Sequence, residues 1–165
     1  MPHVLRHKQI FTYAPAEGVL DGVNRSILRE LQHDPRLTMT ELGRRVGLSS
    51  PAVTERVRRL EEASIIRGYR LDIDPTALGL PIAAYVRIRP NPGQLPKIAD
   101  LARSIPEVVE CHRVTGEDCF VLKVYLPSLD QLDRILDTFL AHGTTTTSLI
   151  QSSPVPLRPP PLPEE

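Results

Sequence analysis

No run of apolar residues in this 165-residue chain is long enough to span a bilayer. The first residues, MPHVLRHKQIF, also lack the apolar stretch and the cleavage site of a secretory signal. These absences lead us to expect a soluble, cytoplasmic protein with no membrane partner. The length suits one ordinary domain or two small ones.

Net charge is lacking as well, since 20 Lys and Arg balance 20 Asp and Glu. A neutral total argues against indiscriminate binding to nucleic acid. The charge is unevenly spread, however: residues 1–70 carry 12 Arg and Lys with 8 Asp and Glu, whereas residues 71–165 carry 8 and 12. This asymmetry favours a basic N-terminal module joined to an acidic C-terminal one.

Cysteine is scarce, and the two cysteines do not suit a disulfide. Cys111 and Cys119 flank a predicted turn at 116–117, where the residue opposite Cys111 falls within 121–123. None of the five histidines is spaced with them like a zinc ligand. The chain also shows no nucleophile–base–orienter set and no glycine-rich phosphate loop. We therefore predict two free thiols, no metal site, no catalytic residue and no cofactor.

The most informative segment is residues 39–60, MTELGRRVGLSSPAVTERVRRL. It predicts two short amphipathic helices joined by a tight turn. Thr38 and Glu41 form a T-x-x-E capping box that opens the first helix, and Gly47 supplies the left-handed residue that ends it. Helix-turn-helix DNA readers are built in this way.

The helices on either side of that turn supply an apolar nucleus. A preceding helix begins at Asp21 as its N-cap and ends near Pro35, with an inward stripe of Val23, Ile27, Leu28 and Leu31. Ser49 or Ser50 caps the helix after the turn. Its predicted inward residues are Ala52, Val53, Val57 and Leu60.

The outward residues of this last helix are candidates for DNA contact. Base reading is assigned to the side chains that can reach base edges in the major groove: Ser50, Thr54, Glu55 and Arg58. Phosphate binding is assigned to the surrounding cations and one cap: Arg44, Arg45, Ser49, Arg56, Arg59, Arg67 and Arg70. The alternative is that these arginines form a solvated helix face paired with Glu55, Glu61 and Glu62.

Beyond residue 60 the apolar period changes to that of strands. Residues 65–73 predict a strand or short hairpin, the wing of a winged helix. The order that follows is β-α-β-β-α-β, with strands expected at 82–88, 108–114, 119–126 and 144–152 and helices between them. Ser128 and Gln131 form the cap of the second of these helices, and Gly143 ends it. This order is the ferredoxin-like split unit.

The fold class predicted is α+β, an N-terminal winged helix-turn-helix followed by a C-terminal ferredoxin-like βαββαβ domain. The boundaries place an irregular extension at 1–18, the DNA-binding domain at 19–75, a hinge at 76–81, the ferredoxin-like domain at 82–153 and a tail at 154–165. The tail, PVPLRPPPLPEE, predicts polyproline II. It is either a ligand for proline-binding domains, a segment draped on a neighbouring subunit, or disordered.

The chain resembles the Lrp/AsnC (leucine-responsive/asparagine regulator, feast/famine) family of prokaryotic transcription factors over roughly residues 20–152. The residues that carry the resemblance in the first half are Leu20-Asp21, Ile27-Leu28, Leu31, Glu41-Leu42, Val46-Gly47-Leu48-Ser49, Val53, Arg56-Val57 and Leu60-Glu61. Those in the second half are Ile66, Gly68-Tyr69, Asp74-Pro75, Leu78-Gly79, Cys111-His112 and Val114-Thr115-Gly116.

This resemblance implies a DNA-binding transcriptional regulator that contacts double-stranded DNA, forms a homo-oligomer (a dimer, tetramer or octamer) and senses an amino acid or similar small effector. The effector site is expected at the residues of one turn and of the last strand: Gly116, Glu117, Asp118, Thr145, Thr146 and Thr147. An ordinary β-branched strand is an equally good interpretation of the threonines.

The sequence departs from the family pattern at four places. Ser64 stands where a Gly usually follows the recognition helix, Gly43 replaces an Ala, and Asn24 replaces an Asp. In the turn, Cys119 aligns with the usual Asp and Asp118 falls one position early. Two alternatives therefore stay open: an architectural DNA-compacting protein of the same fold without an effector, and a ferredoxin-like metabolic enzyme or enzyme-regulatory subunit.

Overall fold

The computed structural model describes residues 18–163, which divide into two units. One unit contains the chain up to Leu71 together with the segment from Leu157 onward, and the other runs from Asp72 to Pro156. The predicted extension at 1–18 lies, apart from Gly18, outside the described residues. Within residues 18–163 no helix has the length and apolar character needed to cross a membrane.

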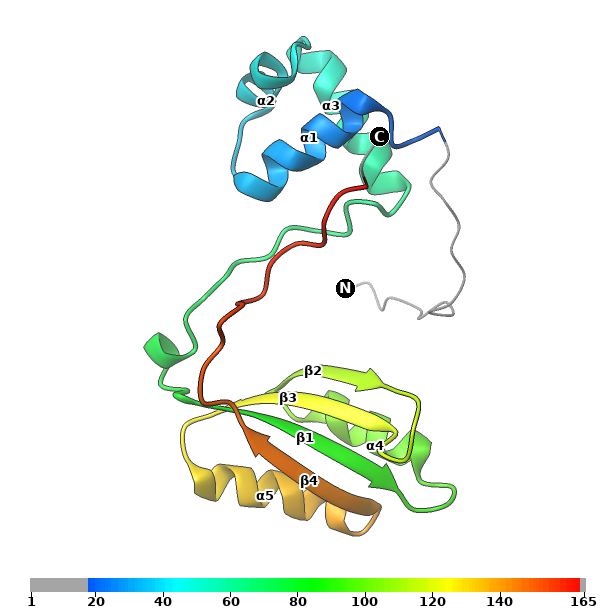
Figure 1. The fold of residues 1–165 in the computed structure, drawn as a ribbon, viewed down its shortest axis with the longest axis vertical. Helices are drawn as coiled ribbons and strands as arrows, with labels where there is room; N and C mark the ends of the chain where they lie inside the picture. The colour runs from blue at the N-terminus through cyan, green and yellow to red at the C-terminus, as the bar shows by residue number, and fades with distance from the viewer. Residues whose placement is uncertain (1–17, 164–165) are drawn as a thin grey trace. The chain divides into compact units, whose positions relative to one another are not determined.

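Three helices form the first unit: α1 (Gly22–His33), α2 (Met39–Val46) and α3 (Ser50–Glu62) (Figure 1). Their buried apolar side chains make one core, comprising Ile27, Leu28, Leu31, Leu42, Val53, Val57 and Leu60. The prediction was wrong for Ala52, which is exposed. Its neighbour Val53 already fills the inward position in that turn of α3, so Ala52 points to solvent.

Side-chain caps fix where these helices begin. Asp21 Oδ1 accepts a hydrogen bond from Asn24 N at 2.7 Å, and Ser49 accepts from Ala52 N. Thr38 Oγ1 accepts from Glu41 N at 3.2 Å. Only half of the predicted capping box is formed, because the Glu41 carboxylate accepts from nearby arginines instead. Gly47 ends α2 with a φ of 72°, the left-handed conformation that its sequence position predicted.

The predicted wing is not formed, since residues 65–73 contain no strand. Ile65 and Ile66 pack against the core of the first unit, but every residue from 67 to 74 is exposed, and Leu71 retains 85% of its accessible surface. A hairpin needs a second strand and an apolar face to bury, and this segment meets neither among residues 18–163. A 3₁₀ turn, η1 (Thr76–Leu78), occupies the predicted hinge.

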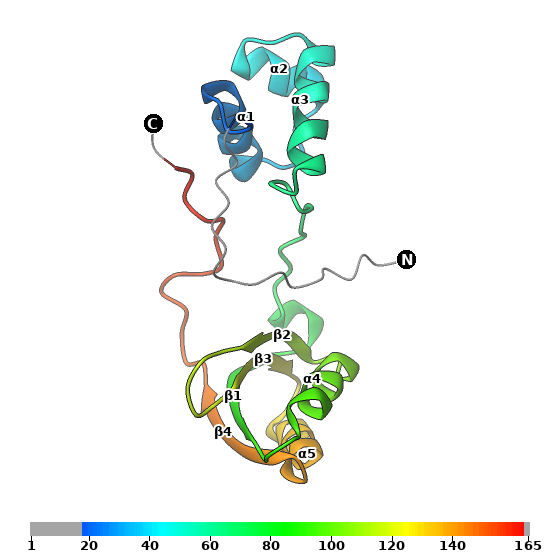
Figure 2. The same cartoon turned by 90° about the vertical axis from the view of Figure 1, so that its right-hand side faces the viewer.

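The second unit is a four-stranded antiparallel sheet with two helices. Its elements follow the predicted order: β1 (Ile82–Pro90), α4 (Leu95–Ser104), β2 (Val108–Arg113), β3 (Phe120–Leu126), α5 (Leu129–Leu140) and β4 (Gly143–Leu149). The strands lie in the order β2-β3-β1-β4, as expected for a ferredoxin-like unit. Both helices cover the same face of the sheet (Figure 2).

The strand register separates two faces of this sheet. Val86 of β1 pairs with Leu122 of β3, and both are fully buried beneath α4 and α5. The alternate residues, such as Tyr85, face the other way, where no helix covers them. We call this side the open face.

Two local features shape the edges of the sheet. The register of β2 against β3 shifts between Val108 and Glu110, so Val109 forms a bulge. Gly143 does not end α5 as predicted, because Ala141 is the C-cap and Gly143 is the first residue of β4. A Cβ atom at Gly143 would collide with the carbonyl oxygen of Arg89 on β1, which explains why glycine occupies this position.

Candidate nucleic-acid interface

The turn between α2 and α3 is held tightly against α2. Leu48 N donates to Gly43 O at 2.8 Å, and a Cβ atom on Gly43 would lie 2.7 Å from Leu48 O. Glycine at this position therefore lets the turn fold back closely onto the helix. Glycine is unfavourable inside a helix, but at position 43, where the family usually has Ala, the close approach of the turn explains its presence.

The predicted base-reading residues share the exposed side of α3. Thr54 and Arg58 are exposed, while Ser50 and Glu55 are partly exposed. Thr54 Oγ1 donates to Ser50 O at 2.8 Å, and Glu55 Oε1 accepts from Arg58 Nη2 at 2.7 Å. All four side chains thus lie along one face of α3, beginning at its N-terminus.

An ion-pair network covers part of this face. Arg58 pairs with both Glu55 and Glu62, and Arg59 Nε donates to Glu55 at 2.9 Å. Hydrogen bonds from Arg58 and then Arg59 lower the pKa of Glu55 to about 2, and Glu55 raises the pKa of Arg58. The solvated-face alternative therefore holds for Arg58 and Arg59, which pair with Glu55 and Glu62, whereas Glu61 accepts a hydrogen bond from Tyr69. Solvent and salt screen exposed pairs of this kind, so they contribute little to stability and DNA can displace them.

The predicted phosphate ligands fall into two groups. Arg45 pairs with Glu30 of α1 at 3.0 Å, Arg44 pairs with Glu41, and Arg56 Nη1 donates to Asp21 Oδ2 at 2.7 Å. Arg56 and Arg45 therefore tie helices together, and Arg56 also lowers the pKa of Asp21.

The remaining predicted phosphate ligands lie outward. Arg67 and Arg70 are exposed, and within residues 18–163 they form no ion pair. Arg59 is also largely exposed, although it shares Glu55. Ser49 Oγ accepts the hydrogen bond of the α3 cap, which leaves its own proton free to donate. The free backbone N–H groups at the start of α3 add positive character there.

In the second unit, the turn between β2 and β3 carries a cluster of charges. Gly116 has a φ of 110°, and Asp118 Oδ1 lies 3.7 Å from Arg89 Nε. Arg87 Nε lies 4.0 Å from Asp118 Oδ2, and Glu117 pairs with Arg89. Sequence reasoning missed both arginines; their alternation with the buried residues of β1 was the signal that could have found them.

The three threonines predicted for the effector site lie on opposite faces of the sheet. Thr146 pairs with Arg87 across β1 and β4 and therefore shares the open face with it. Thr145 and Thr147 pair with Ile88 and Val86, so they lie on the side covered by the helices. Only Thr146 is brought to the face that carries the charged turn.

Comparisons with family models match both units. The model of the AsnC-type helix-turn-helix domain matches residues 20–61, and that of the Lrp/AsnC ligand binding domain matches residues 83–160. The first match contains the whole of α1, α2 and almost all of α3, and the second contains the sheet with both of its helices.

Individual relatives agree with these matches. An uncharacterized HTH-type transcriptional regulator of Bacillus subtilis is 41% identical over 134 residues, covering 81% of this chain and 95% of its own length. The solved structure of LrpC from B. subtilis has a TM-score of 0.77 at 35% identity, covering 81% of this chain and 95% of that one. A transcriptional regulator from Neisseria meningitidis, solved as its L-Met complex, has a TM-score of 0.78 at 30% identity, with coverages of 84% and 94%.

Proposed function

This chain belongs to the Lrp/AsnC family of DNA-binding transcriptional regulators, and from that premise we propose that α3 reads a specific duplex sequence through Ser50, Thr54, Glu55 and Arg58. The observation that carries the proposal is the capped, tightly turned α2–α3 pair, which leaves this one face of α3 exposed. Arg58 pairs with guanine once it leaves Glu55 and Glu62, and Glu55 then accepts from cytosine N4.

Phosphate contacts surround this face. Ser49, Arg44 and Arg59 hold the backbone next to α3, and Arg67 and Arg70 hold it from the extended segment that follows. We leave Arg45 and Arg56 out of this set because their guanidinium groups join helices of the first unit.

The experiment is selection of a preferred site from a random duplex pool, followed by titration of wild-type protein and Arg58→Ala. We expect Arg58→Ala to weaken specific binding by roughly 1–3 kcal/mol and to relax base preference at one position. Arg103→Ala is a matched control, because Arg103 is also exposed and paired at i,i+3, but on α4. An equal loss on selected and random DNA would show that Arg58 reads no base. A footprint that spreads without a preferred site would favour the architectural alternative.

The protein acts as a homo-oligomer in this proposal. The open face presents apolar side chains with no cover, including Tyr85 at 42% exposure and Tyr125 beside Lys123. The exposed segment 67–74 adds Tyr69, Leu71 and Ile73. A two-fold axis that buries such surfaces would present two α3 helices to successive major grooves, about 34 Å apart.

The effector in this proposal is an amino acid bound at the turn between β2 and β3. Arg87 and Arg89 suit its carboxylate, whereas Glu117 and Asp118 suit its ammonium group. Thr146 and the turn at Gly116 complete the site. The relative solved with L-Met supports the class of ligand. The effector can shift DNA binding only by its difference in affinity between two arrangements of the oligomer.

Thermal-shift screening against all amino acids, with and without the selected DNA, tests this site. We expect one or a few amino acids to raise the melting temperature of the wild type and to change its DNA affinity, and Arg89→Ala to abolish both effects. Arg103→Ala should keep them. A response that survives Arg89→Ala would place the effector elsewhere.

A further inference from the structure

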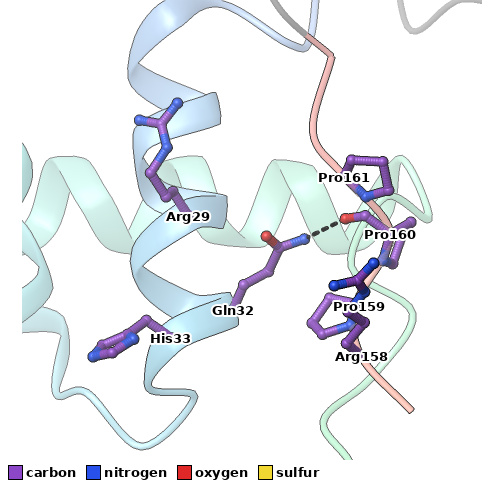
Figure 3. Close-up of a pocket in the computed structure, with 7 residues that line it drawn as sticks. All are labelled: Arg29, Gln32, His33, Arg158, Pro159, Pro160 and Pro161. Atoms are coloured by element: carbon purple, nitrogen blue, oxygen red, sulfur yellow. Dashed lines mark hydrogen bonds between the residues drawn. The ribbon is translucent and has the colours of Figure 1, made fainter. Parts of the chain in front are cut away.

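The C-terminal tail lies against α1 in the first unit. Leu162 packs onto the core of the three helices, and Gln32 Nε2 donates to Pro160 O at 3.1 Å (Figure 3). Leu157, in contrast, keeps 78% of its surface exposed. One leucine of the tail is therefore an anchor, and the other is not.

The tail and α1 together line a groove of about 550 Å³. Arg29, Gln32 and His33 come from the exposed side of α1, and Arg158 with three consecutive prolines comes from the tail. In Figure 3, Gln32 lies between Arg29 and His33 on α1 and points across to the proline backbone. The helix offers one directed amide donor to a segment that passes beside it.

The proline content of the tail suits a backbone that accepts a hydrogen bond from Gln32. Four of the seven residues from 157 to 163 are proline, so the backbone makes no internal hydrogen bonds and its carbonyls are free to accept. The segment is stiff before it docks, and little conformational entropy is lost. We therefore expect one amide hydrogen bond and the partly buried Leu162 to hold it.

We propose that the exposed side of α1 around Gln32 is a docking site for a polyproline II segment, and that its occupant is the tail (residues 157–163) of the same chain. The tail continues from β4 through residues 150–156. Docking gives the helix-turn-helix unit a second, non-covalent connection to the chain that leaves the ferredoxin-like unit, besides the covalent segment that follows α3. The covalent connection keeps the tail at a high effective concentration near its site.

Hydrogen exchange of the full-length protein tests the docking site. We expect Leu162→Asp to speed amide exchange in α1 by roughly tenfold, because burial of one leucine is worth about a decade in an equilibrium constant. Leu157→Asp is the matched control, with the same substitution in the same tail at an exposed position, and should leave α1 unchanged. Equal exchange in wild type and Leu162→Asp would overturn the proposal.

A peptide separates loss of docking from general unfolding. A synthetic peptide of residues 154–165, added to the Leu162→Asp protein, should restore protection of α1, whereas the same peptide carrying Leu162→Asp should not. Failure of the wild-type peptide to restore protection would overturn the proposal. Wild-type protein should respond little to the peptide, because its own tail already covers the docking site on α1.

Mixing identifies which chain supplies the tail. Isotope-labelled Leu162→Asp protein is equilibrated with unlabelled wild type, and exchange is read in the labelled α1. No protection should appear, since each tail docks on its own chain. Restored protection would overturn the assignment to the same chain and show docking between subunits.

One consequence rests on the proposed function. Release of the tail in Leu162→Asp should change affinity for the selected DNA, and the control Leu157→Asp should not. Hydrogen exchange in α1 does not depend on DNA, so failure of specific DNA binding and failure of tail docking give separate results.

Discussion

Arg58 lies between Glu55 and Glu62 on the exposed face of α3, so the proposed DNA contact would exchange one set of charge-assisted contacts for another. The carboxylates keep the arginine extended along the helix surface before DNA arrives. Because these pairs are exposed, their loss costs little, and the phosphates and bases of DNA offer equivalent acceptors.

The pKa of Glu55 gives a direct measure of this network. We expect its carboxyl group to titrate near 2 by NMR, since hydrogen bonds from Arg58 and Arg59 favour the ionised form. The folded-state pKa lies below that of the unfolded chain, so the pairing stabilises the protein above the unfolded pKa and is lost as the pH falls toward 2. Arg58→Ala should raise the midpoint toward 4.5 and Arg103→Ala should not. A wild-type midpoint above 4 would contradict the network.

Sequence alone predicted which side of α3 is exposed and offered Glu55 and Glu62 as partners of its arginines, but it did not predict the partner of Arg56. The helical period places Thr54 and Arg58 on the exposed side of α3 and Val53 and Val57 on its buried side. This period can be recognised from neighbouring residues in the sequence alone. Arg56 turns to Asp21, a contact across 35 positions of the chain, which no local pattern contains. For the same reason the pairing of Arg89 with the β2–β3 turn escaped prediction.

Gly143 is a residue whose role lies in packing between strands. Gly143→Ala should lower the free energy of unfolding by about 1–3 kcal/mol, because the added methyl group collides with the backbone of β1. Chemical denaturation measures the change. Ser148→Ala, at an exposed position of the same strand, should be nearly neutral. Equal stability of Gly143→Ala and wild type would mean that the strand ends can separate at no cost.

The elements of the first unit are defined by their ends. Asp21, Thr38 and Ser49 each cap a helix through a side-chain oxygen, and Gly47 ends α2 in the left-handed region. These signals are short-range, and this explains why helix positions could be predicted so closely. The wing could not be predicted correctly, because strand formation depends on a partner that lies elsewhere.

Ser64 is strained where α3 gives way to the extended segment. Its φ is 58°, the left-handed region in which any side chain other than glycine is unfavourable. Ser64→Gly should therefore stabilise the protein by up to ~1 kcal/mol, measured as a rise in the denaturation midpoint. Ser104→Gly, at the end of α4 without a positive φ, should not stabilise. Loss of stability in Ser64→Gly would contradict the strain argument.

In the ferredoxin-like unit the strand order and most boundaries follow from alternation of apolar residues. Cys111 pairs with Leu122, within the range predicted for it, and both cysteines are free thiols. The errors occur where tertiary contacts decide. Gly143 was expected to end α5 by its residue type, yet it begins β4 because only glycine fits beside β1.

At the scale of the whole molecule, the open face is the side of the sheet that no helix covers. Tyr85 lies there with Lys123 and Tyr125 of β3, whereas the alternate residues of β3 are buried under the helices. Apolar surface that is buried only by another subunit makes folding and assembly depend on each other. In the proposed homo-oligomer, we therefore expect substitutions on this face to change the oligomeric state.

Tyr85→Asp should shift the protein from oligomer to monomer at micromolar concentration, because a buried, unpaired carboxylate is costly at an interface. Analytical ultracentrifugation gives the mass directly. Leu140→Asp, at an exposed position of α5 on the helical side, is the control and should keep the wild-type mass. An unchanged mass for Tyr85→Asp would show that the subunits meet elsewhere.

The bulge at Val109 has a consequence for the behaviour of the protein at high concentration. β2 is an edge strand of the sheet, and a regular edge offers free backbone groups to a neighbouring molecule, the route by which sheets extend into fibrils. The extra residue breaks the spacing of those groups and twists the strand. We expect the bulge to make extension of the sheet at this edge less favourable, so that a concentrated solution of the protein forms fewer edge-to-edge aggregates.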